Sequence, residues 1–240
     1  MPLSGPAGRI TQEQVPVVPI LSPKERRQRN REEMVTAILE TARDIMRQDG
    51  VTALNLNEIA RRLGVTTPAI YVYFPSKDAL YDALFRMAMR LFRESEDEIW
   101  RTTQPDWDRI RAWFETRLAL ASAHPDLYHL ALDAPVPGFV PSAESQEEIR
   151  TVLSGARRGL TEVIEAGVID PGMAPEEALD LLLSMRRGII AEHLGKEASV
   201  PLTSGRFAGL VPRALAVFQV AWAPGRQGMA PAKPRGGDTA

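Results

Sequence analysis

The sequence of 240 residues contains no cysteine, only three histidines and no apolar run long enough to cross a membrane. The lack of cysteine excludes disulfides, thiolate zinc sites and cysteine nucleophiles. A membrane-spanning helix needs roughly 18 consecutive apolar residues, and the N-terminus also lacks the charged-then-apolar order of a secretory signal. We therefore expect a cytoplasmic protein that holds neither a metal nor a cofactor.

Motifs of known enzyme classes are missing as well. The chain has no Gly-x-Ser-x-Gly, no phosphate-binding loop and no dinucleotide-binding glycine motif. His124 and His129 would lie about 140° apart on a helix, the wrong angle for joint metal binding, and Pro125 interrupts that helix. We expect no enzyme; catalysis and a helical adaptor that binds only protein are the alternatives to the function derived below.

Proline and glycine mark both ends of the chain. Residues 1–23 and 224–240 are rich in Pro, Gly and small polar residues without a helical or strand period, so we expect disordered extensions there. Between them apolar residues recur with helical spacing, and alternation typical of strands is almost absent. The predicted fold is all-α, with a three-helix domain over 24–80 and a larger helical domain over 81–223.

Helix boundaries follow from caps, glycines and prolines. We expect a first helix from near Arg31 to Gly50 and a short second one from Asn55 to Gly64, with Glu58 closing a capping box. Ser76 is expected to cap a long fourth helix that runs towards Trp100. Further helices are predicted over 68–74, 107–121, 127–131, 144–165, 175–194 and 204–222, with a loop over 135–141.

A short helix, a glycine turn and a second short helix form a helix-turn-helix, whose second helix fits the major groove of DNA. Residues 56–80 read LNEIARRLGVTTPAIYVYFPSKDAL. Over residues 31–85 the chain resembles the TetR family of repressors, which implies a ligand-responsive transcriptional regulator. The matching positions are Ile59, Ala60, Gly64, Val65, Thr66, Thr67, Ile70, Tyr71, Tyr73, Phe74 and Lys77.

Helical geometry assigns roles to the third helix independently of the family. At about 100° per residue, Ile70 and Phe74 share a face that packs on the first helix. Pro68 and Val72 then turn outward, where they would meet the bases. Because both are apolar, they can contact thymine methyl groups but cannot make bidentate hydrogen bonds.

Polar residues around this face are candidates for the remaining DNA contacts. Hydroxyl and guanidinium groups read base edges, whereas a tyrosine, a lysine and free helix amides hold phosphates. Plainer alternatives stay open: Tyr71 only packs, the arginines are solvated, and Asn55 is only a cap. The polar candidates are Asn55, Arg61, Arg62, Thr66, Thr67, Tyr71, Tyr73 and Lys77.

Basic residues gather just before the first predicted helix. Lys24–Arg31 (KERRQRNR) holds five basic residues and one acidic residue. It is either a solvated helix start or an arm that follows the DNA backbone or enters a minor groove. From Lys24 to Leu80 ten basic and eight acidic residues give a net charge of +2, which leaves −4 for the rest of a chain of net charge −2.

The resemblance also implies that the later helices form a ligand pocket and a homodimer interface. The interface helices would be 175–194 and 204–222, and the first of them has more apolar surface than one core face needs. A dimer would read a palindromic operator with half-sites about one helical turn, or a multiple of it, apart. A bound small-molecule effector would favour a conformation that no longer matches this spacing and release the DNA.

Aromatic side chains accompanied by a few polar groups are the candidate contacts for that effector. For each of them a core position is the simpler alternative. Arg186 and Arg187 lie mid-helix among apolar residues, so a buried guanidinium there needs a carboxylate, from Glu165 or Glu192 or from a ligand. The candidates are Trp107, Trp113, Phe114, Arg117, Tyr128, His129, Phe139, Met185, Arg186 and Glu192.

Overall fold

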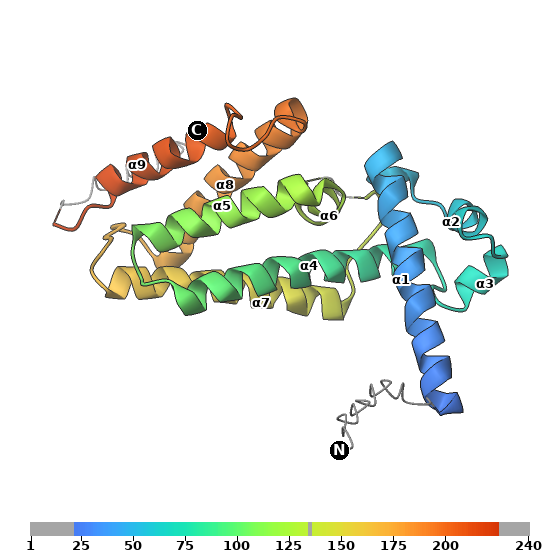
Figure 1. The fold of residues 1–240 in the computed structure, drawn as a ribbon. Coiled ribbons are helices and arrows are strands. Elements are labelled where there is room, and N and C mark those ends of the chain that lie inside the picture. Colours follow the sequence, from blue (N-terminus) through green and yellow to red (C-terminus); the bar gives the residue numbers. More distant parts are fainter. Residues whose placement is uncertain (1–21, 134–135, 226–240) are drawn as a thin grey trace, which may run out of the picture.

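A computed structural model describes residues 22–133 and 136–225, and every regular element within them is a helix (Figure 1). The predicted all-α class is therefore confirmed. The predicted disordered ends fall largely on 1–21 and 226–240, which lie outside the described residues. Among the helices that are described, none combines the length and the apolar character that crossing a bilayer requires.

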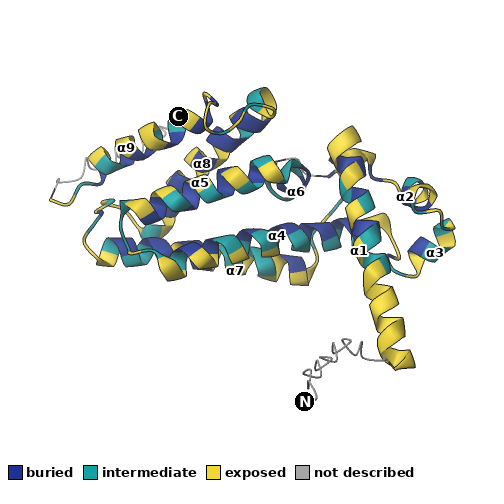
Figure 2. Cartoon of the chain, viewed as in Figure 1, coloured by how far each residue is buried: buried dark blue, intermediate teal, exposed yellow. Residues whose placement is uncertain are grey.

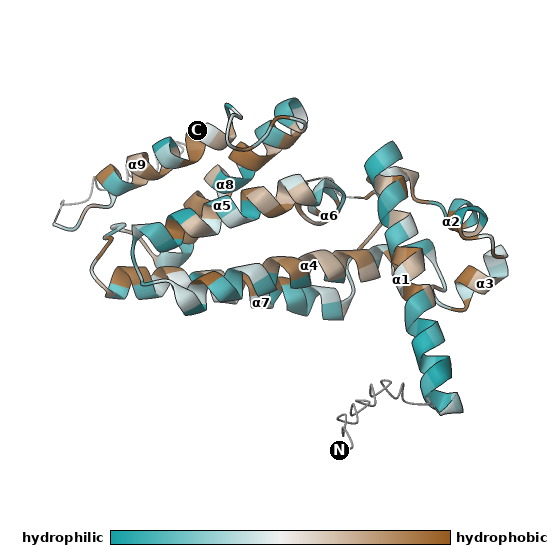
Figure 3. Cartoon of the chain, in the orientation of Figure 1, coloured by the Kyte–Doolittle hydropathy of each residue, from teal (hydrophilic) through white to brown (hydrophobic). Residues whose placement is uncertain are grey.

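Helix α1 (Pro23–Asp49) begins well before the expected start near Arg31. The Ser22 hydroxyl accepts a hydrogen bond from the Glu25 amide, and the Glu25 carboxylate accepts one from the Ser22 amide, which forms a capping box. Residues 22–33 are all exposed, so these first turns have no apolar stripe to reveal them (Figures 2 and 3). Gly50 ends the helix with a φ of 87°, as predicted.

Three short elements complete the N-terminal head, defined here as residues 22–76. They are η1 (Val51–Ala53), α2 (Leu56–Leu63) and α3 (Thr67–Tyr71). Asn55 caps α2 as expected, but the predicted capping box is wrong, because the Glu58 carboxylate pairs with Arg61 and Arg62. Helix α3 ends at Tyr71 instead of Phe74, and its N-cap Thr66 makes no side-chain capping bond.

The rest of the described chain, residues 77–225, forms a larger helical body. Ser76 caps α4 (Lys77–Thr102) through the Ala79 amide at 3.0 Å, as predicted. The last helix begins later than expected, because the short turn η3 precedes it. The remaining elements are α5 (Trp107–Ala123), α6 (Pro125–Tyr128), the π-helical turn η2 (His129–Asp133), α7 (Ala143–Glu165), α8 (Pro175–Glu197), η3 (Ala208–Leu210) and α9 (Val211–Ala221).

Helix α4 connects the head to the centre of the body (Figure 1). Its apolar face carries Leu80 and Leu84 near the head and Ala88 and Phe92 further along, all fully buried. It packs chiefly along α7, where a Cβ atom at Gly159 would overlap the Trp100 ring. One continuous hydrophobic core therefore runs from the head into the body.

Candidate DNA interface and ligand cavity

Helix α3 is anchored from one side and exposed on the other. Ile70 is fully buried and Phe74 nearly so, whereas Pro68 and Val72 are exposed, with Val72 at 67%. The predicted division of the two faces is confirmed. Tyr71 is also half exposed, at 49%, so it does not merely fill the core.

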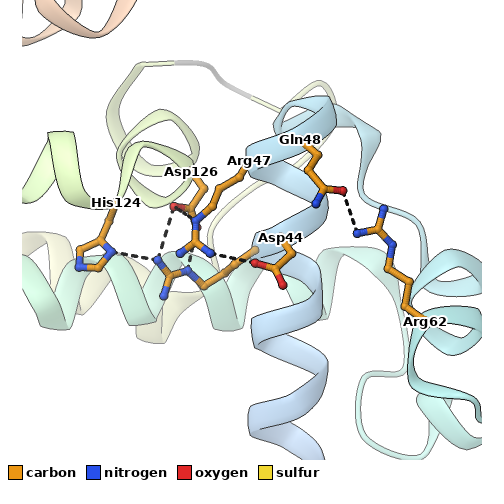
Figure 4. Close-up of polar contacts among 7 residues, drawn as sticks. Asp44, Arg47, Gln48, Arg62, His124 and Asp126 are labelled. Atoms are coloured by element: carbon orange, nitrogen blue, oxygen red, sulfur yellow. Dashed lines mark hydrogen bonds and ion pairs between the residues drawn. The ribbon is translucent and has the colours of Figure 1, made fainter. Parts of the chain in front are cut away.

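The arginines of α2 have different surroundings. The Arg61 side chain is 72% exposed and pairs with Glu58 at 2.7 Å. Arg62 pairs with Glu58 at 2.8 Å and also donates to the Gln48 side chain of α1 at 3.1 Å (Figure 4). Hydrogen bonds from Arg61 and then Arg62 lower the pKa of Glu58 to about 2. Arg62 thus ties α2 to α1, and Arg61 is the more accessible of the two.

The remaining polar candidates lie around the ends of α3, except Asn55, which caps α2. Thr66 and Asn55 are exposed, and Thr67 and Tyr73 are partly buried. The Lys77 ammonium donates to the Thr52 carbonyl at 3.3 Å. The Arg31 guanidinium lies 5.2 Å from the centre of the Tyr73 ring, a contact that the sequence did not reveal. The basic first turns of α1 therefore end beside the α3 region.

Helices α4 to α8 enclose a cavity of about 180 Å³ in the body. Three predicted contacts, Arg117, Tyr128 and Arg186, line it. The other candidates lie elsewhere. Trp113 and Phe114 are buried in the core, Trp107 packs against it, and Phe139 packs on Tyr81 and Phe85. His129 lies at the junction with α1, and Met185 and Glu192 line a groove between α8 and the η3 segment.

A buried cluster of three charges forms one wall of this cavity. The Glu96 carboxylate pairs with the guanidinium groups of Arg117 and Arg186, and all three residues are at most 5% exposed. Burial, opposed by the nearby Glu96, lowers the pKa of Arg186 to about 9, so it remains charged at neutral pH. The expectation that Glu165 or Glu192 pairs with Arg186 was wrong, because the carboxylate that pairs with Arg186 is Glu96 of α4.

Aromatic rings hold the two arginines in place. The Arg186 guanidinium lies 3.8 Å from the centre of the Trp113 ring, and that of Arg117 lies 3.9 Å from the centre of Phe92. Arg186 also donates to the Trp113 carbonyl at 3.4 Å. Such stacking supports a charge where water is absent. Trp113 therefore acts on the cavity wall through Arg186.

A second buried carboxylate joins the head to the body. The Asp126 side chain is completely buried and pairs with two arginines of α1, Arg43 at 2.7 Å and Arg47 at 3.2 Å (Figure 4). Arg43 also lies 3.0 Å from Nδ1 of His124. Burial and the Arg43 charge lower the pKa of His124. We call this set the junction cluster; no sequence pattern pointed to it.

Known proteins resemble both parts of the chain. The family described as "Bacterial regulatory proteins, tetR family" matches residues 38–84, from α1 into the first turns of α4. An HTH-type transcriptional regulator of Mycobacterium tuberculosis is 28% identical over 145 residues, which span 58% of each chain. Tetracycline repressor protein class C of Escherichia coli is 33% identical over 70 residues, 28% of this chain and 32% of that one.

The likeness in structure extends over the body as well. The transcriptional regulator FadR of Bacillus subtilis, in complex with stearoyl-CoA, matches with a TM-score of 0.60 and 19% identity. That match covers 76% of this chain and 96% of FadR. At this identity the likeness shows a common fold.

Proposed function

Because this chain belongs to the TetR family of bacterial regulatory proteins, we propose that it is a repressor that binds a palindromic operator as a homodimer. A small molecule in the cavity would release it from the DNA. The observation that carries this proposal is α3, a short helix anchored by Ile70 that turns Pro68, Tyr71 and Val72 to solvent. Such a regulator acts where the genome lies, in the cytoplasm.

The proposed DNA contacts divide into base readers and phosphate holders. Pro68 and Val72 would enter the major groove and touch thymine methyl groups, with the Thr66 hydroxyl beside them. The exposed Arg61 guanidinium would read base edges, whereas Tyr73 and Lys77 would contact phosphates. The exposed basic residues of Lys24–Arg31 would add further phosphate contacts. Arg31 lies beside Tyr73, so the basic first turns of α1 would continue the row of phosphate contacts that Tyr73 begins.

The outer surface of α8 and α9 supports the homodimer. Leu181 and Met185 of α8 are 46% and 39% exposed, and Val217 and Val220 of α9 are 63% and 59% exposed. Met185 also lines a groove between α8 and the η3 segment. A two-fold axis makes such a patch complementary to itself, so a second copy would remove these side chains from water.

The position of α6 supports a route from the ligand to the DNA. Tyr128 lines the cavity, and Asp126 on the same short helix holds Arg43 and Arg47 of α1. A ligand that binds better to one position of α6 would shift α1 and the head with it. Its effect on operator affinity is limited by its preference between the two states.

An unbiased selection of genomic DNA fragments by the full chain tests the proposal. We expect a pseudo-palindrome whose half-sites are centred about one helical turn, or a multiple of it, apart. Light scattering of the free protein should give twice the chain mass of 26.5 kDa. A reporter placed behind the recovered operator should be silenced by the protein. If no DNA is recovered at low salt, the alternative of a helical protein-binding adaptor is favoured. If light scattering gives the mass of a monomer, the proposal of a palindromic operator read by two copies is wrong.

A further inference from the structure

The cavity contains more positive than negative charge. Among its lining residues in the described part of the chain, Glu96 is the only acid, whereas Arg117, Arg186 and Arg187 are bases. Arg187 is exposed, but the other three charges are buried. One buried carboxylate therefore faces two buried guanidinium groups, which leaves a single positive charge uncompensated.

The two buried arginines also have unused hydrogen-bond donors. The Nε atoms of Arg117 and Arg186 are inaccessible to solvent and have no hydrogen-bond partner within the described residues. Buried polar groups in native proteins are nearly always hydrogen-bonded, so each exception requires an explanation. An anionic ligand beside the two guanidinium groups would compensate the extra charge.

The other walls of the cavity are apolar, and its volume is small. Phe85 and Met89 of α4, Ile149 and Val152 of α7 and Leu183 of α8 line it. Its volume of about 180 Å³ lies below the roughly 300–1,000 Å³ of pockets for drug-sized ligands and close to the ~150 Å³ cavity that holds benzene. The space admits one ring or a short branched chain.

We propose that the effector is a small organic acid whose single carboxylate binds the guanidinium groups of Arg117 and Arg186 beside Glu96. Its apolar body would lie against Phe85, Met89 and Leu183. A monoanion fits best, because it would neutralise the one uncompensated charge, and the fork of a guanidinium matches a carboxylate. That the bound acid regulates DNA binding rests on the proposed function, whereas the anion site itself is inferred from the cavity alone.

Calorimetric titration of the full chain without DNA tests the site. The probes are benzoate, phenylacetate and 3-methylbutanoate, each paired with its primary amide, which has nearly the same shape and no charge. We expect the best acid to bind at least tenfold more tightly than its amide. Arg186→Met should reduce this preference to less than threefold, because Arg117 and Glu96 then neutralise each other.

Arg158→Met is the matched control, because Arg158 is an exposed arginine of α7 that does not line the cavity. It should change the affinity for the acid less than threefold, and circular dichroism should show that both variants fold. Equal affinity for acid and amide, full preference in Arg186→Met, or no binding of any of the three acids at millimolar concentration would overturn the proposal. If the protein binds its operator but none of the acids, only this inference is wrong. If it binds an acid but no operator, only the proposed function is wrong.

Discussion

The head and the body place their charges and apolar groups in opposite ways. In the head, Glu58 and Arg61 form an exposed pair, and apolar Val72 points to solvent from α3. In the body, Glu96 and Arg186 form a buried pair inside an apolar cavity. A groove in DNA is read by what a protein presents outward, whereas a small molecule is recognised by what it encloses. This difference supports the proposal that the head meets DNA and the body a small molecule, with the junction cluster between them.

The contrast should be largest in the stability lost when the carboxylate of each pair, Glu96 in the body or Glu58 in the head, is removed. Glu96→Ala leaves two buried guanidinium groups without a carboxylate, so we expect a loss of about 3–5 kcal/mol in the free energy of unfolding. Glu58→Ala removes an exposed partner and should leave the stability unchanged within error. Denaturant titration of both variants decides the matter. Equal losses would mean that the Glu96 cluster is not truly buried.

An acidic side chain at the C-cap of α3 should abolish DNA binding without affecting the fold. Val72→Glu places a carboxylate where the major groove would lie, so we expect at least a hundredfold loss of operator affinity. The thermal midpoint should hardly change, because Val72 is 67% exposed. Val140→Glu, at a position that is 75% exposed in a loop of the body, is the matched control. Binding that survives in Val72→Glu would exclude α3 as the recognition helix.

The junction cluster should couple the two regions. Asp126→Asn keeps one acceptor but removes the charge that Arg43 and Arg47 share, which should cost about 1–2 kcal/mol of stability. We also expect the effect of an effector on operator affinity to fall below threefold. Asp44→Asn is the control, because Asp44 pairs with Arg47 at an exposed site. An unchanged effector response in Asp126→Asn would place the coupling elsewhere, for example in α4.

The basic turns of α1 should contribute less than α3. With the five basic residues of Lys24–Arg31 replaced by Gln, we expect about a tenfold loss of affinity at low salt. The slope of log affinity against log salt should fall by about 0.9 for each phosphate contact removed. Gln is a good helix former, so α1 should persist. An unchanged slope would leave these turns as a solvated helix start and nothing more.

The smallest expected effect concerns pH at the junction cluster. The pKa of His124 lies below its ordinary 6.5 in the folded chain, so folding favours the neutral ring. The unfolded chain then takes up protons first as the pH falls, and stability is lost below about pH 6.5. The midpoint temperature of thermal unfolding should fall more between pH 7 and pH 5 in the wild type than in His124→Asn. Parallel curves would show that Arg43, Arg47 and Asp126 hold the junction without His124.

The sequence predicts the head better than the body, for a physical reason. The faces of α3 follow from the spacing of Ile70 and Phe74 alone, and Gly50 and Ser76 end and begin helices by local rules. The early start of α1 was also encoded locally, because Ser22 and Glu25 have the spacing of a capping box. Apolar periodicity could not reveal it, since these turns cover no core.

The cavity depends on residues that are distant in sequence. Arg186 could be singled out because a charge among apolar residues needs a partner, but its partner Glu96 lies 90 positions earlier. Arg117 joins the same carboxylate from a third helix. The sequence around Asp126 does not reveal its role, because that role depends on ion pairs with Arg43 and Arg47 across the junction. Such pairings follow from how helices pack, which no local pattern specifies.

The affinity of the full chain for the selected operator, compared with its affinity for a scrambled duplex of equal length, decides whether α3 recognises a DNA sequence. Fluorescence anisotropy at physiological salt should give at least a thousandfold preference for the operator, with two chains bound per duplex. Equal affinity for the two duplexes, or one chain per operator, would contradict the account of an outward-facing α3 presented twice to DNA.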